Sequence, residues 1–324
     1  MDEFAAIERL FAPLAKGEPG AFALTDDAAV LALPPGRRLV VTKDVMVAGV
    51  HFLVDDEPAL VGRKLLRVNL SDLAAMGANP RAYLLGATLS LPFDEAWLAG
   101  FTEGLRQDQE SFGVTLVGGD TTAHRGPIVL SLTALGEIEA GRELRRAGAR
   151  PGDLVIVSGT IGDGVLGLKV LNGGFPDLAA SHRKALAGRY HLPEPRVALG
   201  RNLVGVAHAA IDVSDGLVAD LGHVCHVSGV GAVIEAAQVP LSPAARAVVA
   251  EEADLPPGLL TGGDDYELLF AIDPDTAGRL PELAAASAVA LTVIGRIVEG
   301  RGIQVVDATG KPLALPDRTG WTHF

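Results

Sequence analysis

Apolar residues recur along the chain at two spacings, and each spacing predicts its own kind of element. A spacing of three or four residues predicts helices, and short β-branched or apolar runs between turn residues predict strands. The first half predicts helices at residues 2–15, 59–76 and 94–110, and strands at 38–42, 82–91, 114–117 and 128–138. The second half predicts strands at 154–158, 210–213, 232–235, 266–272, 291–297 and 303–306, and helices at 163–171, 196–208, 217–227, 243–253 and 275–286.

The order of these elements predicts the fold class. Helices and strands do not alternate strictly, which favours two α+β domains over one doubly wound sheet. The stretch 139–153 is polar and rich in Gly and Arg, which is typical of a domain boundary. We therefore expect one domain over residues 1–140 and a second over residues 150–324.

Composition narrows the class of partner. With 48% apolar residues, the 324-residue chain can bury a large core. Its 40 acidic and 27 basic side chains give a net charge of −13, which argues against nucleic acid or an anionic membrane as partner. The single cysteine, Cys225, excludes an intrachain disulfide and a cysteine-based metal cage. The sequence shows neither a signal peptide nor a membrane span, so we expect a cytoplasmic protein.

Aspartates recur beside apolar strand-like runs, often next to glycine. They are Asp26, Asp27, Asp44, Asp72, Asp120, Asp212, Asp215, Asp264 and Asp265. Because Asp is a poor strand former, this recurrence suggests carboxylates aimed into a shared space, where a hard cation such as Mg²⁺ would offset their repulsion. For any one of them the alternative is a cap or a turn; Asp215, for example, could cap the helix that follows it.

The familiar nucleotide motifs are absent. The sequence has no Walker A motif, and the glycines between Gly159 and Gly164 have the wrong spacing for a dinucleotide fingerprint. What remains is a carboxylate site that binds a polyphosphate through Mg²⁺. Such a site suffices for phosphoryl transfer, which needs mainly positioning and charge neutralisation.

An ordered series of segments resembles the thiamine-monophosphate kinase family. The segments are Asp26-Asp27, Asp44–Phe52, Lys64–Pro80, Gly118–Thr122, Ile211–Leu217, Gly262–Leu268 and Gly320–Phe324. The resemblance implies a two-domain fold like that of aminoimidazole ribonucleotide synthetase. It also implies a homodimer, in which the N-terminal domains share a β-barrel and the C-terminal α+β domain completes the active site. The implied reaction is the last step of thiamine diphosphate biosynthesis: direct in-line transfer from ATP to thiamine monophosphate, dependent on several Mg²⁺ ions.

The resemblance also assigns roles to individual residues. The metal ligands it implies are Asp27, Thr42, Lys43, Asp44, Asp72, Asp120, Asp212 and Asp215, with Asp44, Asp72 and Asp120 catalytic. It places the nucleotide at Gly119, Asp120, Arg146 and Ser214, and thiamine monophosphate at His51, Asp264 and Trp321. Lys43 stands where the family usually has Thr or Ser, and Asp264 where it usually has Glu.

Two other functions stay open at this point. One is another ATP-using synthetase of the same superfamily. The selenophosphate-forming members rely on a reactive Cys or selenocysteine near the N-terminus, whereas Cys225 lies mid-chain. The other is a protein that binds Mg²⁺ and nucleotide without turnover, which Lys43 could produce by disabling one metal site.

Overall fold

The computed structural model describes residues 3–92, 94–250, 257–316 and 319–320, and it divides the chain into two compact units. Unit 1 comprises Met1–Leu73 and Ala78–Gly141; unit 2 comprises Ala74–Gly77 and Arg142–Phe324. The chain enters unit 2 within the polar stretch 139–153. Ala74–Gly77 belongs to unit 2 because Ala74 and Ala75 are part of one of its hydrophobic clusters, which composition alone does not reveal.

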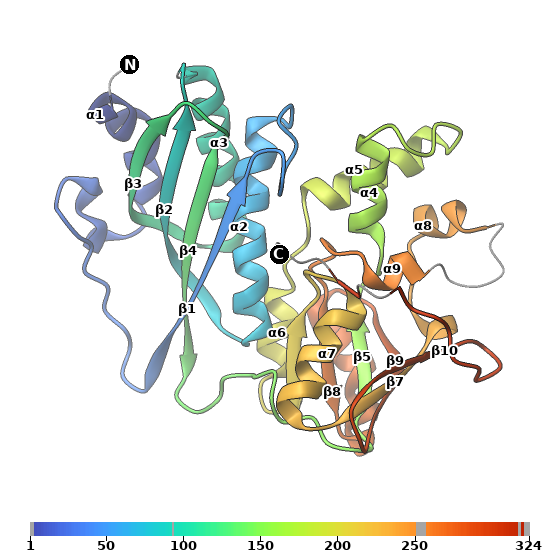
Figure 1. The fold of residues 1–324 in the computed structure, drawn as a ribbon. Coiled ribbons are helices and arrows are strands. Elements are labelled where there is room, and N and C mark those ends of the chain that lie inside the picture. The colour runs from blue at the N-terminus through green and yellow to red at the C-terminus, as the bar shows by residue number, and fades with distance from the viewer. Residues whose placement is uncertain (1–2, 93, 251–256, 317–318, 321–324) are drawn as a thin grey trace. The chain divides into compact units, whose positions relative to one another are not determined.

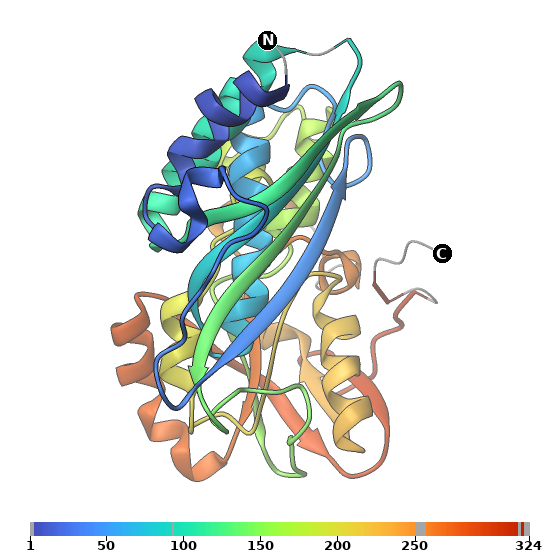
Figure 2. The same cartoon turned by 90° about the vertical axis from the view of Figure 1, so that its left-hand side faces the viewer.

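Unit 1 is built on a four-stranded sheet in the order β1-β4-β2-β3. Its strands are β1 (Arg37–Val47), β2 (Asn79–Ser90), β3 (Thr115–His124) and β4 (Val129–Glu139). All neighbours are antiparallel except β2 and β3, whose parallel pairing requires a crossover connection. Helix α3 (Glu95–Phe112) supplies it, and α2 (Pro58–Ala75) lies beside α3 on the same face of the sheet (Figures 1 and 2).

The two faces of this sheet differ in burial. Leu132 and Leu85 lie on the helix-covered face and are almost fully buried. On the other face, Val41 is 54% exposed and Leu84 is 39% exposed. Short helical segments precede β1, namely α1 (Glu3–Ala6), η1 (Ile7–Phe11), η2 (Ala12–Ala15) and η3 (Pro19–Leu24). Unit 1 therefore has a sheet with one face covered by helices and one largely open face.

Unit 2 is built on a six-stranded sheet in the order β10-β7-β9-β5-β8-β6. Its strands are β5 (Leu154–Ser158), β6 (Ala209–Asp212), β7 (Gly231–Glu235), β8 (Leu268–Ile272), β9 (Leu291–Val298) and β10 (Gly302–Val306). Its helical segments are α4 (Asp163–Leu171), α5 (Ala180–His191), α6 (Val197–Leu203), α7 (Leu217–Ser228), η4 (Ala236–Gln238), α8 (Pro243–Val248), α9 (Pro257–Thr261), η5 (Pro274–Arg279) and α10 (Leu280–Ser287).

Alternating side chains of β5 divide the core of unit 2 between two layers. Val155 and Val157 belong to the cluster that contains Leu221 of α7, whereas Ile156 belongs to the cluster that contains Leu199 of α6 and Leu283 of α10. This alternation follows from the two-residue period of a strand. The sheet is consequently covered by helices on both faces, and Cys225 of α7 is a buried core residue.

The α+β class and the two-domain architecture predicted from the sequence are confirmed, and the main differences concern element ends. Strands β1 and β3 run to Val47 and His124, well beyond the predicted 42 and 117. Pairing with β4 and β2 holds the Asp, Gly and Thr residues of these segments in the sheet, overriding their low strand propensity. Helices α5 and α9 were not predicted, and the expected helix 2–15 consists of short turns of three helix types.

None of the helices in the described ranges combines the length and the apolar character that crossing a membrane requires.

Candidate active site

Two of the predicted ligands, Asp44 and Asp72, come together on the helix-covered face of the unit 1 sheet. The Thr42 hydroxyl of β1 donates to Asp72 Oδ2 of α2 at 2.5 Å. Asp44 is two residues beyond Thr42, so its side chain lies on the same face of β1. Burial and the charge of Asp72 raise the pKa of Asp44 to about 7. The pair therefore holds more negative charge than its surroundings favour, as expected of a cation site.

The turn after β1 holds His51 against the helix that carries Asp72. The Val47 N–H donates to His51 Nδ1 at 3.0 Å, so the ring proton of the neutral imidazole is on Nε2. Lys64 of α2 is 3% exposed, and its ammonium donates to the His51 carbonyl at 3.2 Å. The sequence suggested no site role for Lys64, but its contact fixes the turn that carries a predicted substrate residue.

Asp120 does not join Asp44 and Asp72 within one chain, contrary to the shared space expected from the sequence. In the sheet, Asp44 is paired with Leu132, Leu132 with Leu85, and Leu85 with Gly119. Directly paired residues share a face, so Gly119 lies on the face of Asp44 and Asp120 lies on the open face. β1 and β3 are also the two edge strands, three strand spacings or roughly 14 Å apart along the sheet.

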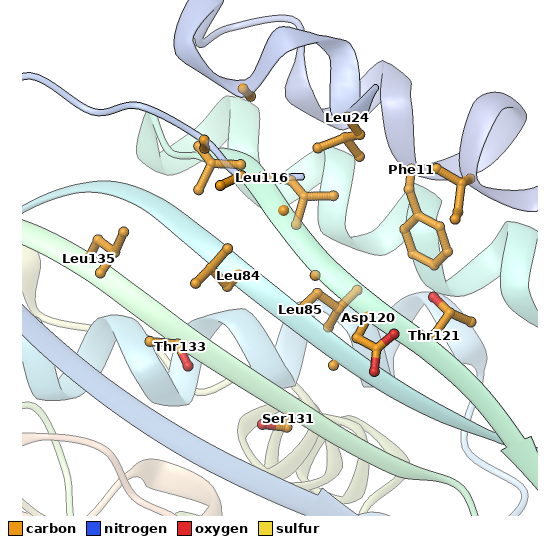
Figure 3. Close-up of a pocket in the computed structure, with 18 of the residues that line it drawn as sticks. Phe11, Leu24, Leu84, Leu85, Leu116, Asp120, Thr121, Ser131, Thr133 and Leu135 are labelled. Carbon is orange, nitrogen blue, oxygen red and sulfur yellow. The ribbon is translucent and has the colours of Figure 1, made fainter. Parts of the chain in front are cut away.

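Asp120 lines a cavity on the open face instead. The cavity has a volume of about 680 Å³, and its polar lining includes Asp26, Asp27, Lys43 and Asp120. Figure 3 shows the side chain of Asp120 over the sheet, with the apolar lining residues Phe11, Leu24, Leu84, Leu116 and Leu135 around the same space. The ammonium of Lys43 donates to Ser131 Oγ at 2.5 Å. Three predicted metal ligands, Asp27, Lys43 and Asp120, therefore share this pocket.

Gly119 is required by the backbone of the neighbouring strand. A Cβ at this position would lie 2.0 Å from the Leu85 carbonyl oxygen, so a larger residue would force β2 and β3 apart. Across the residues that the structure describes, no group of three or more His, Cys, Asp or Glu side chains is arranged to hold a metal ion. The expected cluster of aspartates is thus divided, within unit 1, into the pair Asp44–Asp72 and the pocket containing Asp27 and Asp120.

In unit 2, two loops bring a predicted nucleotide contact next to a predicted substrate contact. The Asp264 N–H donates to the Ser214 carbonyl at 2.9 Å, and the Tyr266 N–H donates to the Val213 carbonyl at 2.7 Å. Asp264 and Tyr266 have φ values of +70° and +52°, which side-chain-bearing residues rarely adopt. Such strain persists only where surrounding contacts hold it, and it is concentrated at functional sites.

Asp220, which the sequence did not single out, organises the loop before α7. One of its carboxylate oxygens accepts the N–H groups of Ser214, Asp215 and Gly216, each at 3.1 Å. Burial and the charge of Asp215 raise the pKa of Asp220 to about 7. The hydrogen bonds from the Asp215 and Gly216 N–H groups and the charge of Arg146 lower this pKa, but their effect is smaller. The N-cap of α7 is Gly216 and has no side-chain cap, so Asp215 does not cap this helix.

Two further buried carboxylates support the strained loop. Asp265 accepts the N–H groups of Gly162 and Gly164 at 2.7 and 3.0 Å, so these N–H groups of the glycine-rich segment before α4 already have an acceptor within the protein. Glu267 is fully buried and pairs with Arg196 at 2.5 Å and Arg189 at 2.9 Å. These contacts hold both sides of the backbone around Asp264 and Tyr266.

Glu267→Ala is expected to lower the free energy of unfolding of the chain by about 3–5 kcal/mol, because the change leaves two partly buried guanidinium groups without their carboxylate. Urea denaturation followed by circular dichroism measures this loss. Glu235→Ala, which changes an exposed glutamate in the same unit, serves as the control and should stay within about 0.5 kcal/mol of the parent protein. An equal loss in both variants would contradict the structural role of the Glu267 cluster.

The remaining predicted residues are also placed in unit 2, apart from Trp321, which lies outside the described residues. Asp212 is the last residue of β6 and is 4% exposed, whereas Arg146 is exposed. A Cβ at Gly320 would lie 2.5 Å from Ala219 Cβ and 3.3 Å from the Asp215 carbonyl oxygen. Residue 320 therefore packs against the loop that carries Asp215.

Comparison with known proteins finds matches over both units of the chain. The model of the AIR synthase related protein N-terminal domain matches residues 25–138, and that of the AIR synthase related protein C-terminal domain matches residues 150–308. A curated thiamine-monophosphate kinase of Caulobacter vibrioides is 45% identical over 324 residues, covering 99% of this chain and 90% of the relative.

Solved structures extend the similarity. The crystal structure of thiamine-monophosphate kinase from Stenotrophomonas maltophilia K279a has a TM-score of 0.82 and 41% identity, covering 90% of this chain and 91% of that chain. The structure of AaThiL complexed with AMPPCP and TMP has a TM-score of 0.79 and 33% identity, covering 92% and 91%. Similarity of this extent, over both matched domains, shows that the chain belongs to the thiamine-monophosphate kinase family.

Proposed function

We propose that this chain transfers the γ-phosphoryl group of ATP to the phosphate of thiamine monophosphate, which yields thiamine diphosphate and ADP. The observation that carries the proposal is the 45% identity to a thiamine-monophosphate kinase over nearly the whole chain. The related AaThiL structure contains AMPPCP and TMP, a pair that matches the two substrates proposed here.

The chemistry of the acceptor explains the residue types at the site. The attacking group is a phosphate oxygen that is already largely ionised near neutral pH, so no strong general base is needed. The obstacle is repulsion between two phosphate groups. Carboxylates that hold cations, together with a guanidinium that can donate two parallel hydrogen bonds, address that obstacle directly.

The donor set around Asp72 fits Mg²⁺. Two carboxylates and the Thr42 hydroxyl offer hard oxygen ligands, and Mg²⁺ usually takes one or two carboxylates with waters and substrate phosphates. Asn69, one turn before Asp72, is fully buried, and its Oδ1 accepts no hydrogen bond from the described residues. A bound water or cation would satisfy such an oxygen. When bound there, Mg²⁺ would offset the negative charge of the phosphate groups.

The other predicted residues are assigned to the two substrates. We assign Ser214, Arg146 and Gly119 to the nucleotide, with the arginine as a bidentate donor to phosphate oxygens. His51 and Asp264 are assigned to thiamine monophosphate. Trp321 is assigned to it as well, because an aromatic plane can stack on the aminopyrimidine or attract the cationic thiazolium.

We also propose that the working form is a homodimer built on the open face of unit 1. The sheet of unit 1 ends in the edge strands β1 and β3, whose outer backbone groups can pair with another copy. In a twofold dimer that closes two sheets into a barrel, β1 of one copy would meet β3 of the other. The open face of β1 carries exposed apolar side chains at Leu39, Val41 and Val45, a composition that such a barrel would bury.

A steady-state assay tests the proposed reaction. Purified protein with ATP and Mg²⁺ should form thiamine diphosphate from thiamine monophosphate, and much more slowly from thiamine, which lacks the ionised acceptor. Absence of product from both would refute the proposal. Binding of Mg·ATP by calorimetry with no phosphate transferred would instead support the nucleotide-binding function, and turnover with another acceptor would support a superfamily synthetase. The cytoplasmic location stays a prediction.

A further inference from the structure

A single carboxylate accepts the N–H groups of the loop between β6 and α7. Asp220 is 2% exposed and accepts three consecutive backbone N–H groups, from Ser214 to Gly216, on one oxygen. We infer that Asp220 is a positioning residue for phosphoryl transfer, which fixes Ser214 and Asp215. This inference rests on the proposed function.

The hydrogen bonds of Asp220 decide what the loop can offer a ligand. Backbone N–H groups at the start of a helix normally form an anion site. Here the three N–H groups of this loop are directed at the protein's own carboxylate, so they are not the groups that hold the nucleotide phosphates. The partly exposed side chains of Ser214, assigned to the nucleotide, and Asp215, assigned to a metal ion, remain available, whereas Gly216 and Asp220 are buried.

Neighbouring backbone leaves the loop little room to adopt another shape. A Cβ at Gly216 would lie 2.8 Å from the Thr261 carbonyl carbon, and a Cβ at Gly263 would lie 2.2 Å from the Ser214 carbonyl oxygen. Gly216 also has a φ of +132°, which favours glycine. This packing limits the loop on one side, and the hydrogen bonds to Asp220 limit it on the other. Together they fix the positions of Ser214 and Asp215.

Asp220→Ala and Asp220→Asn separate the acceptor oxygen of this carboxylate from its charge. The alanine variant loses the acceptor of three N–H groups and should lower kcat at least about thirtyfold and raise the KM for ATP. The asparagine variant keeps an acceptor oxygen, so kcat should fall only about fivefold.

Asp153→Ala is the matched control. Asp153 is 3% exposed, accepts the Arg150 N–H and contacts His208 in the same unit, and neither partner is an assigned residue. This variant should lose melting temperature as Asp220→Ala does, yet retain kcat within about twofold. Equal fractional losses of kcat in Asp220→Ala and Asp153→Ala, or a loss in Asp220→Asn as large as in Asp220→Ala, would overturn the inference.

Calorimetry with Mg·ADP distinguishes failure of this inference from failure of the proposed function. If the parent protein makes no thiamine diphosphate, the proposed function fails, and Mg·ADP should still bind at least about tenfold more weakly to Asp220→Ala than to Asp153→Ala. Equal affinities would refute the role of Asp220. If Asp220→Ala melts below the assay temperature, Asp220→Asn is compared with Asp153→Ala instead, and a kcat no lower than that of Asp153→Ala would refute the role of Asp220.

Discussion

Asp44→Asn is expected to lower the rate of thiamine diphosphate formation at least about a hundredfold, because it removes a charge that stabilises the transition state of phosphoryl transfer. Asparagine has nearly the shape of aspartate but no charge. The pair that Asp44 forms with Asp72 would therefore offer a cation one negative charge fewer. Steady-state kinetics at saturating ATP and Mg²⁺ measures the loss.

Asp94→Asn is the control for this change. Asp94 is exposed and caps α3 through the N–H groups of Ala96 and Trp97, and asparagine is an equally good cap. Its turnover should stay within about twofold of the parent protein. A near-normal rate for Asp44→Asn would contradict the role of Asp44 as a ligand.

The same substitution should stabilise the protein when divalent cations are removed. Because burial and Asp72 raise the pKa of Asp44 to about 7 in the folded chain, the native state binds a proton that the unfolded state has lost. Stability therefore falls as the pH rises from about 4 to about 7, and Asp44→Asn abolishes that fall. Allowing for solvent screening, the variant should be about 1–2 kcal/mol more stable at pH 8 in EDTA.

Urea denaturation at a series of pH values, in EDTA, measures this gain. Saturating Mg²⁺ should remove the gain, because a cation compensates the charge of Asp44 only in the parent protein. A variant that is less stable than the parent at pH 8 in EDTA would show that the Asp44–Asp72 repulsion is not present in the folded state.

The sequence predicted the helix that carries Asp72 more accurately than the strands that carry Asp44 and Asp120. The bounds of the helix carrying Asp72 differ from the prediction by one residue at each end, because its apolar spacing is regular and Gly77 ends it. The strands carrying Asp44 and Asp120 were expected to stop earlier, since Asp, Gly and Thr are poor strand formers. Only pairing with β4 and β2 extends them, and that pairing depends on contacts distant in sequence.

The separation of Asp44 from Asp120 could not be predicted for the same reason. The face of a strand residue depends on register, and a shift of one residue reverses it. The register of β2 and β3 shifts between Tyr83 and Leu84, a feature without a sequence signal. The sequence did not single out Asp220, because a carboxylate inside a predicted helix is usually interpreted as solvent-exposed. Its partners are backbone N–H groups, which no sequence pattern identifies.

Transfer of a radioactive γ-phosphate tests the central claim most directly. The protein is mixed with labelled ATP, thiamine monophosphate and Mg²⁺, and the reaction is quenched within one turnover. Direct in-line transfer predicts that the label passes to thiamine diphosphate in equal amount with the ADP formed, with none on the protein. Label bound to the protein, or ADP and free phosphate formed without labelled thiamine diphosphate, would contradict the account.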